Sequence, residues 1–432
     1  MSSYIIVGAG VFGVSTAFHL IKQNPNASVT LVDRDAYDAE PRVAASWDWN
    51  KVVRADYEDI VYCRLGIESQ DVFKNDPLWR PYFYETGIFW TCRDEFGGAV
   101  IDNYAKLGRK ADLKAISVEE AKKMHGGLFE QADYGGVKEV LINRTSGWGA
   151  AGDCLCAVTR EAMRLGVKYV VAEVSDLKFD GQGRCTGVKT SKGETLSAEH
   201  VVLSTGAYTA KLLEMSSYST GKKGLSADGR IVAGGITTGM TKLNDEDYRR
   251  HASMPVGVQG YTPSTGPFIG SLPPTRDREL KWWGQTIFSN TREVVPGRYV
   301  SAPPPESDYS QWKVSKRLKQ DIDQANHVFY GKNGKDWKMD KYRICWDAFT
   351  TSGDFIISPH TAAKGLYIAT CGNFHGWKFF PVLGRYVAQM LDGTLEKELS
   401  EKWAWDRVWP DPAAFADYPR TEMRELTGEA RL

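Results

Sequence analysis

Short apolar runs and amphipathic stretches alternate near the start of the chain. Residues 4–7 are an apolar run, residues 14–22 carry apolar side chains at helical spacing, and residues 29–32 are a second apolar run that ends at Asp33. Between the first run and the amphipathic stretch lies the glycine-rich segment 8–13. A short apolar run is typical of a buried strand, and apolar residues three or four apart are typical of a helix. The pattern therefore predicts a strand, a tight turn, a helix and a second strand, in this order.

The same alternation returns in the middle of the chain and again near its end. In the middle, residues 151–165 predict a helix, and apolar runs at 168–174 and 201–203 predict strands. Near the end, residues 365–370 predict a strand and residues 380–391 a helix, with a glycine-rich turn between them. We therefore expect one discontinuous nucleotide-binding α/β domain, made of residues 1–45, 151–224 and 341–399.

The segments between these pieces have a different composition. Residues 46–150 and 225–340 are rich in Trp, Tyr, Pro and charged side chains. Aromatic side chains suit the walls of a ligand cavity, although core packing uses them as readily. We expect the two segments to form an inserted substrate-binding domain with an antiparallel sheet, which makes the fold class mixed α/β. Residues 400–432, with three tryptophans among charges, are expected to form a tail that lies back on the body.

Composition argues against several classes of partner. Lys plus Arg and Asp plus Glu both number 54, so the formal net charge is zero, whereas nucleic acids and anionic membranes attract proteins with a basic surplus. No apolar run reaches the roughly eighteen residues of a membrane span. The seven cysteines are odd in number, scattered, and form no CxxC pair. We therefore expect no nucleic-acid partner, no membrane partner, no disulfide framework and no metal site.

The glycine-rich segment has the spacing of a dinucleotide-binding turn. Gly8, Gly10 and Gly13 form the pattern G-x-G-x-x-G between the first strand and the first helix. Such glycines let the backbone approach a pyrophosphate, which the helix N-terminus beyond them attracts. Asp33 lies 20 residues after Gly13, where a carboxylate can bind ribose hydroxyls. An ordinary glycine-rich turn is the alternative, but it would not require the strand before it, the helix and second strand after it, and the acid at the end of that strand.

The layout of the chain favours FAD over NAD. An NAD-dependent enzyme usually continues strand, helix and strand through one contiguous domain. Here other material interrupts the domain twice, and a second glycine-rich segment follows residue 370. A long, extended cofactor suits this layout. We therefore expect an interrupted Rossmann-like FAD-binding domain, with an NAD-dependent dehydrogenase as the less favoured alternative.

Four short segments resemble a known family of flavoenzymes. Residues 343–347 (RICWD), 354–357 (DFII) and 373–379 (NFHGWKF) resemble the C-terminal signature of the monomeric sarcosine oxidase-like flavin amine oxidases. They resemble its fungal fructosyl amino acid oxidase (amadoriase) branch even more closely. Residues 46–54 (SWDWNKVVR) look like the flavin-contacting stretch of that branch. The similarity runs from residue 5 to about residue 405.

The resemblance implies a covalently attached flavin. In the family, the cysteine at the place of Cys345 forms a thioether to the 8α carbon of the flavin ring. Such a bond prevents loss of the cofactor and raises its reduction potential. From the residues alone, a buried structural cysteine is the commoner outcome. The cofactor implied by the resemblance is FAD, attached as 8α-S-cysteinyl to Cys345.

The resemblance also implies roles for two lysines and a histidine. Lys281 resembles the family lysine that lies above the flavin and promotes reaction with oxygen, where a buried ammonium stabilises a developing anion. Lys378 resembles the lysine that meets the carboxylate of the substrate, and His375 is expected to contact flavin or substrate. Taken alone, Lys281 could be a solvated lysine and His375 a structural histidine. Lys378 lies near a helix N-terminus, where the helix dipole disfavours a merely structural cation.

Further cofactor contacts are expected around these residues. Lys51 and Arg54 resemble basic residues near the flavin ring, where positive charge stabilises the anionic reduced form. As surface residues of a loop they would need no explanation. The remaining residues expected to contact the cofactor are Val11, Phe12, Arg34, Ser46, Val174, Gly206, Asn373, Gly376 and Lys378.

Two departures from the amadoriase pattern concern the substrate. Amadoriases carry Trp-x-Trp-Arg near the C-terminus, and that arginine pairs with the amino acid's carboxylate. Here residues 403–405 (WAW) are followed by Asp406, and Arg407 comes one place late. The amadoriase glutamate that contacts the sugar has no match in residues 265–274. Both departures argue against fructosyl amino acids as substrates.

The expected function is the oxidation of a secondary amine, an N-methyl or otherwise N-alkylated amino acid. Hydride passes to the flavin, and O2 is reduced to H2O2. The alternatives are an amadoriase proper and an oxidase of saccharopine or pipecolate. A catalytically inactive binding protein would leave the coincidence of Cys345, Lys281 and Lys378 without a reason.

Assembly and location are further expectations. We expect a monomer. The last three residues, Ala430-Arg431-Leu432, are a variant of the peroxisomal address that ends in Leu. A peroxisomal location is therefore expected, and a cytoplasmic one otherwise.

Overall fold

A six-stranded, mostly parallel sheet carries the glycine-rich turn. The computed structural model describes residues 2–259 and 269–428. The strand order is β21-β22-β13-β1-β2-β9, and only the β21–β22 pair is antiparallel. Its strands come from the start, the middle and the end of the chain, as the pattern of apolar runs predicts. Their bounds are β1 (Ser3–Val7), β2 (Ser28–Asp33), β9 (Lys168–Val171), β13 (His200–Leu203), β21 (Ile356–Pro359) and β22 (Leu366–Thr370).

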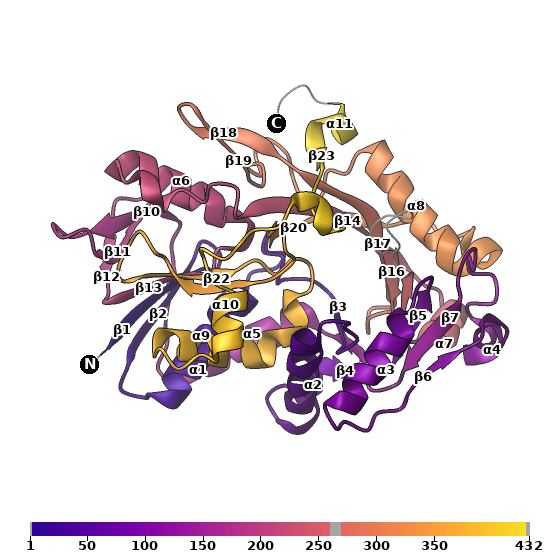
Figure 1. Cartoon of the computed structure of the whole chain (residues 1–432). Helices are drawn as coiled ribbons and strands as arrows, with labels where there is room; N and C mark the ends of the chain where they lie inside the picture. The colour runs from indigo at the N-terminus through magenta and orange to yellow at the C-terminus, as the bar shows by residue number, and fades with distance from the viewer. Residues whose placement is uncertain (1, 260–268, 429–432) are drawn as a thin grey trace.

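Three helices cover one face of this sheet (Figure 1). They are α1 (Val11–Gln23), α5 (Ala151–Arg164) and α9 (Phe380–Leu391), and each agrees with a predicted helix to within three residues at either end. Helices α1 and α9 approach closely, because a Cβ on Gly384 would lie 1.9 Å from the backbone oxygen of Ser15. Ser15 also accepts from the Gly384 amide and donates to the Phe380 carbonyl, both at 2.7 Å.

The predicted strand 168–174 is two strands. After β9 the chain leaves the parallel sheet, and the second strand pairs in a separate antiparallel sheet. The residues at the break, Ala172 and Glu173, line the cavity described below, so the chain turns away where it meets that space. The separate sheet consists of β10 (Val174–Phe179), β11 (Cys185–Thr190) and β12 (Thr195–Ser197), with α6 (Thr209–Thr220) packed on β10.

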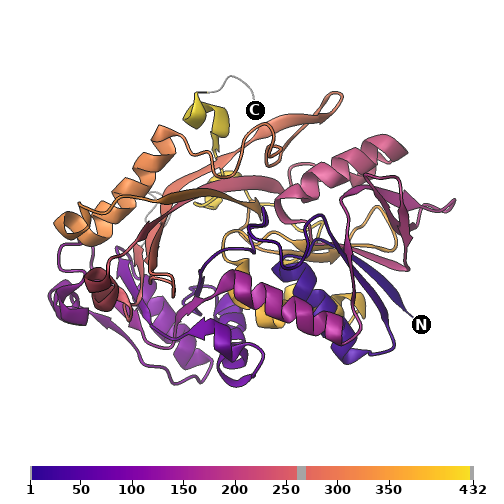
Figure 2. The ribbon, with the colours of Figure 1, turned by 180° about the vertical axis from the view of Figure 1, so that it is seen from behind.

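A nine-stranded, mostly antiparallel sheet forms the other part of the molecule. Its path is β20-β14-β17-β16-β15-β5-β7-β6, and β23 pairs with β17. Helix α8 (Lys316–Tyr330) lies on the outer side of the long strands (Figure 2) and packs buried residues such as Ile322 against Gly239. The strands are β5 (Ile88–Cys92), β6 (Leu113–Ile116), β7 (Glu139–Asn143), β14 (Val232–Lys242), β15 (Val256–Gln259), β16 (Ile269–Leu272), β17 (Glu279–Ser289), β20 (Lys341–Phe349) and β23 (Thr421–Glu422).

Strand β20 joins the two parts. It lies inside residues 341–399, which the sequence assigns to the FAD-binding domain, yet it is the edge strand of the nine-stranded sheet. The next two strands along the chain, β21 and β22, belong to the six-stranded sheet. The domain boundaries therefore stay a proposal.

The tail and the remaining elements complete the chain. In the tail, Trp403 and Trp405 are buried against the two cores of the six-stranded sheet. The remaining helices are α2 (Ile60–Asn75), α3 (Phe96–Lys106), α4 (Val118–Lys123), α7 (Asp245–His251), α10 (Lys397–Lys402) and α11 (Met423–Thr427). The remaining strands are β3 (Lys51–Val53), β4 (Phe83–Tyr84), β8 (Gly147–Gly149), β18 (Thr291–Val295) and β19 (Arg298–Ser301).

Candidate active site

A cavity of about 1000 Å³ is lined by residues of both large sheets. It extends from the glycine-rich turn after β1 to the inner faces of β14, β17 and β20. A channel of this kind can hold a dinucleotide at one end and a small substrate at the other. Of the site residues expected from the sequence, all but Gly13 line it: Gly8, Gly10, Val11, Phe12, Asp33, Arg34, Ser46, Lys51, Val174, Gly206, Lys281, Cys345, Asn373, His375, Gly376 and Lys378.

The turn after β1 requires its glycines for space. Gly8 has a φ of +101°, and a Cβ there would lie 2.4 Å from the Ser204 carbonyl oxygen. A Cβ on Gly10 would lie 2.8 Å from the Ser46 hydroxyl. A Cβ on Gly13 would lie 1.8 Å from the Gly8 carbonyl oxygen, so Gly13 packs α1 against the turn instead of facing the cavity. The three glycines thus bring the start of α1 to the cavity wall.

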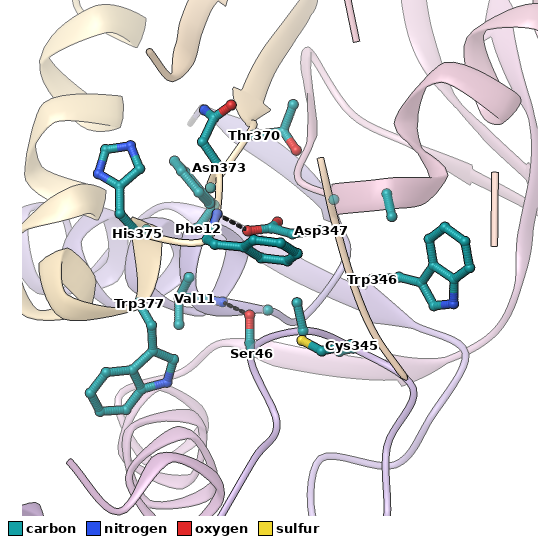
Figure 3. A pocket seen from close by; sticks show the side chains of 18 of the residues that line it. Val11, Phe12, Ser46, Cys345, Trp346, Asp347, Thr370, Asn373, His375 and Trp377 are labelled. Atoms are coloured by element: carbon teal, nitrogen blue, oxygen red, sulfur yellow. Dashed lines mark hydrogen bonds between the residues drawn. The ribbon is translucent and has the colours of Figure 1, made fainter. Parts of the chain in front are cut away.

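The N-terminus of α1 is a suitable place for an anion to bind. Its N-cap, Gly10, has no side chain to cap the helix, and the Val11 amide donates instead to the Ser46 hydroxyl at 2.9 Å (Figure 3). Helix N-termini of this kind bind phosphate groups. Within the described chain, Ser204, Thr370 and Trp377 also line the cavity, and each has a buried polar side-chain atom without a hydrogen-bond partner. These features fit a bound FAD, whose pyrophosphate and ring system need such partners.

Asp33 lies at the end of β2, as predicted, but its carboxylate already has protein partners. One oxygen accepts from the Ala9 amide at 2.7 Å, and the other pairs with Arg42 at 3.1 Å. The neighbouring Arg34 guanidinium lies over the Tyr208 ring, 4.4 Å from its centre. Asp33 and Arg34 both line the cavity, and contact with the adenosine half of FAD stays a prediction for each.

The other end of the cavity is strongly basic. The Lys281 amine, on β17, lies 2.6 Å from one carboxylate oxygen of Asp48, and the Lys51 amine lies 2.7 Å from the other. Arg343, on β20, lies 3.8 Å from the same carboxylate. Burial lowers the pKa of the Lys281 amine to about 8, against the opposing effect of Asp48 and with further lowering by Lys51.

Cys345 faces this basic end. Its side chain is buried, and its Sγ lies 3.7 Å from the Lys51 Nζ. Two residues along β20, the Asp347 carboxylate accepts from the Phe374 amide at 2.9 Å, which ties the strand to the turn before α9 (Figure 3). The predicted contacts Asn373 and Gly376 lie in that turn. The predicted tether and the predicted flavin contacts are thus brought to one wall.

Lys378 lies in the 3-10 turn that leads into α9, where its amine donates to the His375 carbonyl at 3.0 Å. Burial, with repulsion from Arg54, holds the pKa of Lys378 well below its ordinary value. Arg54 also lines the cavity, and its guanidinium lies 4.2 Å from the centre of the Tyr57 ring. The half-buried Arg54 and the buried Lys378 therefore lie at one place on the cavity wall, where an anionic ligand would be stabilised and would in turn favour the charged form of the lysine.

His375 lines the cavity, but both of its ring nitrogens have protein partners. Nε2 lies 3.0 Å from the Gly353 carbonyl oxygen and Nδ1 lies 3.1 Å from the Tyr57 hydroxyl. Because a carbonyl can only accept, Nε2 carries the proton and the Tyr57 hydroxyl donates to Nδ1. Burial, followed by repulsion from Lys378, holds the pKa of His375 well below its ordinary value. The geometry therefore supports a neutral histidine that positions Tyr57, and direct contact with flavin or substrate stays a prediction.

Sequence reasoning missed Asp48 and Tyr57. Asp48 lies in the segment 46–54, which resembles a flavin-contacting stretch, and Tyr57 lies just after it. Their position there is the one feature of the sequence that could have indicated a role in the site. The Asp48 side chain is fully buried, and its carboxylate is the shared partner of the basic groups. An isolated aspartate in a sequence gives no indication of partners more than two hundred residues away.

In the tail, Arg407, which comes one place later than the amadoriase arginine, contacts other parts of the protein. Arg407 donates to the Phe355 carbonyl at 2.8 Å and to the Ser352 hydroxyl at 3.1 Å, and it lies over the Trp409 ring. Asp406 pairs with Arg230 at 3.0 Å. Both side chains are thus engaged in packing the tail. Of the segment that lacks the sugar-contacting glutamate, residues 265–268 lie outside the described residues.

Two kinds of feature are absent from residues 2–259 and 269–428. No group of three or more His, Cys, Asp or Glu side chains in these ranges is arranged to hold a metal ion. None of the helices described there is both long enough and apolar enough to cross a bilayer.

Comparison with known proteins shows the family to which the chain belongs. The L-saccharopine oxidase of Schizosaccharomyces pombe is 25% identical, over 97% of this chain and 98% of its own length. The monomeric sarcosine oxidase of Bacillus sp. is 23% identical, over 92% and 94%. A modified fructosyl peptide oxidase from Aspergillus nidulans has the same fold, with a TM-score of 0.84, 22% identity and coverage of 100% and 99%. Residues 3–390 match the family described as FAD dependent oxidoreductase (DAO), and the chain therefore belongs to that family of FAD-dependent enzymes.

Proposed function

We propose that this protein is an FAD-dependent oxidase of a secondary amine, with an N-methyl or N-alkyl amino acid as its substrate. The observation that carries the proposal is one cavity that joins the dinucleotide turn to two basic side chains, the half-buried Arg54 and the buried Lys378, and to Lys281 with its ion-pair partner Asp48. When bound, FAD would supply the redox chemistry, which is transfer of a hydride from the carbon next to the amine nitrogen and of two electrons to O2. The amine becomes an imine, and O2 with two protons becomes H2O2.

The substrate end favours an amine that carries a carboxylate. Arg54 and Lys378 supply two basic side chains on one part of the wall, and a bound carboxylate would favour the charged form of Lys378 and accept charge-assisted hydrogen bonds from both. Trp90, Trp283 and Phe415 also line the cavity. Aromatic, desolvating walls disfavour a protonated amine, which must be neutral to lose a hydride. We therefore expect flavin reduction to become faster as the pH rises.

The relatives support two narrower alternatives. The similarity to L-saccharopine oxidase extends over nearly the whole chain, which supports an N-alkylated amino acid with a second amino acid moiety as a candidate substrate. The likeness to fructosyl peptide oxidases supports an amadoriase. Against the latter stand Asp406 and Arg407, which pack the tail instead of lining the cavity. Release of glucosone from a fructosyl amino acid would establish the amadoriase reaction.

We further propose that Cys345 carries the flavin through a thioether. Its buried sulfur lies on the cavity wall, 3.7 Å from the Lys51 amine. Acid precipitation of the purified protein tests this: the yellow colour should stay with the pellet. Cys345→Ala should release it to the supernatant, and Cys154→Ala, a buried cysteine of α5 away from the cavity, should not. Colour in the supernatant from the unaltered protein would exclude the thioether.

A monomeric state and a peroxisomal location also remain proposals. The tripeptide Ala430-Arg431-Leu432 lies outside the described residues. Fusion of the tail to a fluorescent protein would test the address, since deleting the tripeptide should abolish import. Sedimentation or light scattering of the purified protein would give its oligomeric state.

A further inference from the structure

Asp48 lies behind the wall of the cavity at its basic end and contacts two lysines, Lys281 and Lys51, that line it. It lies in the loop between β2 and β3, and its side chain is fully buried. One carboxylate oxygen lies 2.6 Å from the Lys281 Nζ, and also accepts from the Trp49 amide at 2.9 Å. The other lies 2.7 Å from the Lys51 Nζ. A single carboxylate thus connects two lysines from different elements.

The charges around Lys281 come from three elements. Asp48 on the loop is the acid in contact with it, while Lys51 on β3 and Arg343 on β20 are further cations of the same group. Cys345 on β20 also contributes to its electrostatic surroundings. The Lys281 amine in addition donates to the Asn50 carbonyl at 3.0 Å. With three cations and one carboxylate, removal of Asp48 would leave the cations without their shared anion.

We propose that Asp48 is a positioning residue for Lys281, which keeps the amine protonated at neutral pH and fixes its Nζ at the cavity wall. The proposal rests on the proposed function, in which Lys281 promotes reaction with oxygen. Its physical basis is that a buried ammonium is costly unless a carboxylate compensates its charge. The ion pair at 2.6 Å supplies that compensation, and the Asn50 carbonyl fixes the direction of the amine.

The electrostatics agree with this geometry. Burial would raise the pKa of Asp48, but Lys281, Lys51 and Arg343 outweigh it and hold the pKa well below its ordinary value. Asp48 is therefore ionised at neutral pH and in turn raises the pKa of Lys281. Without it, burial and the repulsion by Lys51 would lower the pKa of Lys281 further. Each unit by which that pKa falls below the assay pH reduces the protonated fraction about tenfold.

The first test is the pH profile of reoxidation of the reduced holoenzyme by O2. In the unaltered protein the rate should fall as the pH rises through the pKa of Lys281. In Asp48→Asn this fall should occur at lower pH, and Asp48→Glu should restore the original profile. Asp321→Asn, a buried aspartate of α8 that lies 3.8 Å from Arg317 and does not line the cavity, is the matched control. It should leave the profile unchanged.

The second test is thermal unfolding across pH, which does not depend on turnover. A lysine whose pKa is about 8 when folded and 10.5 when unfolded binds more protons in the unfolded state between these values, so stability rises with pH there. Asp48→Asn should make this rise begin at lower pH. Lys281→Met should remove it, and the double variant should behave like Lys281→Met.

The outcomes separate the two proposals. If Lys281→Met slows reoxidation but Asp48→Asn shifts neither profile, the inference about Asp48 is wrong. If Lys281→Met leaves reoxidation unchanged, the oxygen role of Lys281 fails, and the unfolding profile still decides whether Asp48 controls the amine. If Asp48→Asn alone prevents folding while the double variant Asp48→Asn/Lys281→Met folds, this result would support the inference, because the second substitution removes the ammonium that the first leaves unpaired. Failure of both variants to fold would contradict it, because Asp48 would then act chiefly through Lys51 and Arg343.

Discussion

Single side chains decide the charge of the cavity. Lys51, Arg54, Lys281 and Lys378 bring positive charge to one end of it, and Asp48 compensates part of that charge. Reduction of a flavin and of O2 both develop negative charge, which such a surrounding stabilises. The cations differ in their partners, so their roles can be separated by substitution.

Lys281→Met should slow reoxidation of the reduced enzyme by roughly two orders of magnitude, the usual cost of removing one preorganised electrostatic partner. Flavin reduction by substrate should change little, because Lys281 pairs with Asp48 and not with Arg54 or Lys378. Stopped-flow spectroscopy of the two half-reactions measures both rates. Lys242→Met, an exposed lysine of the neighbouring β14, is the control and should alter neither rate. An unchanged reoxidation rate in Lys281→Met would remove it from the mechanism.

Lys378→Gln should raise KM for an N-methyl amino acid by roughly 10- to 100-fold, since a hydrogen bond to a charged group contributes about 1.5–3 kcal/mol. The effect on kcat should be smaller, because binding of the carboxylate is the same before and during the reaction. Steady-state kinetics with a matched amine that lacks the carboxylate is the control. An equal effect on both amines would contradict the carboxylate role.

Local elements could be predicted from the sequence, and long-range pairings could not. Helices α1, α5 and α9 follow from apolar spacing within each segment, and the turn at residues 8–13 follows from its glycines. The Asp48–Lys281 pair joins residues that no local pattern connects. The pairing of β20 with β14 in the nine-stranded sheet could not be predicted either, because the sequence of a strand does not show which strand it pairs with. Resemblance to a family supplied Cys345 and Lys281, which composition alone does not distinguish from ordinary residues.

The close packing of α1 against the glycine-rich turn can be tested by substitution of Gly13. Gly13→Ala should destabilise the protein by about 1–3 kcal/mol, the usual cost of overpacking, because its Cβ would lie 1.8 Å from the Gly8 carbonyl oxygen. FAD content should fall as the turn shifts. In Gly98→Ala in α3 the new Cβ would meet nothing within 4 Å beyond the local helix backbone, so this variant should be neutral or slightly stabilising. Urea unfolding and the ratio of flavin to protein absorbance measure both effects, and equal behaviour of the two variants would contradict the close packing.

The two large sheets meet around one cavity, so its ligand should stabilise the whole fold. A ligand that binds only the folded state raises its stability with concentration. In Cys345→Ala, which should allow removal of the cofactor, added FAD should raise the Tm progressively. NAD should not, and a larger shift with NAD than with FAD would contradict the assignment of the cavity.

The most direct measurement is anaerobic mixing of the purified protein with an N-methyl amino acid, followed by admission of air. The visible flavin absorbance should bleach with the amine and return with O2, and one H2O2 should form for each amine oxidised. Bleaching that requires a pyridine nucleotide, or the absence of any flavin absorbance in the purified protein, would contradict the assignment as an amine oxidase.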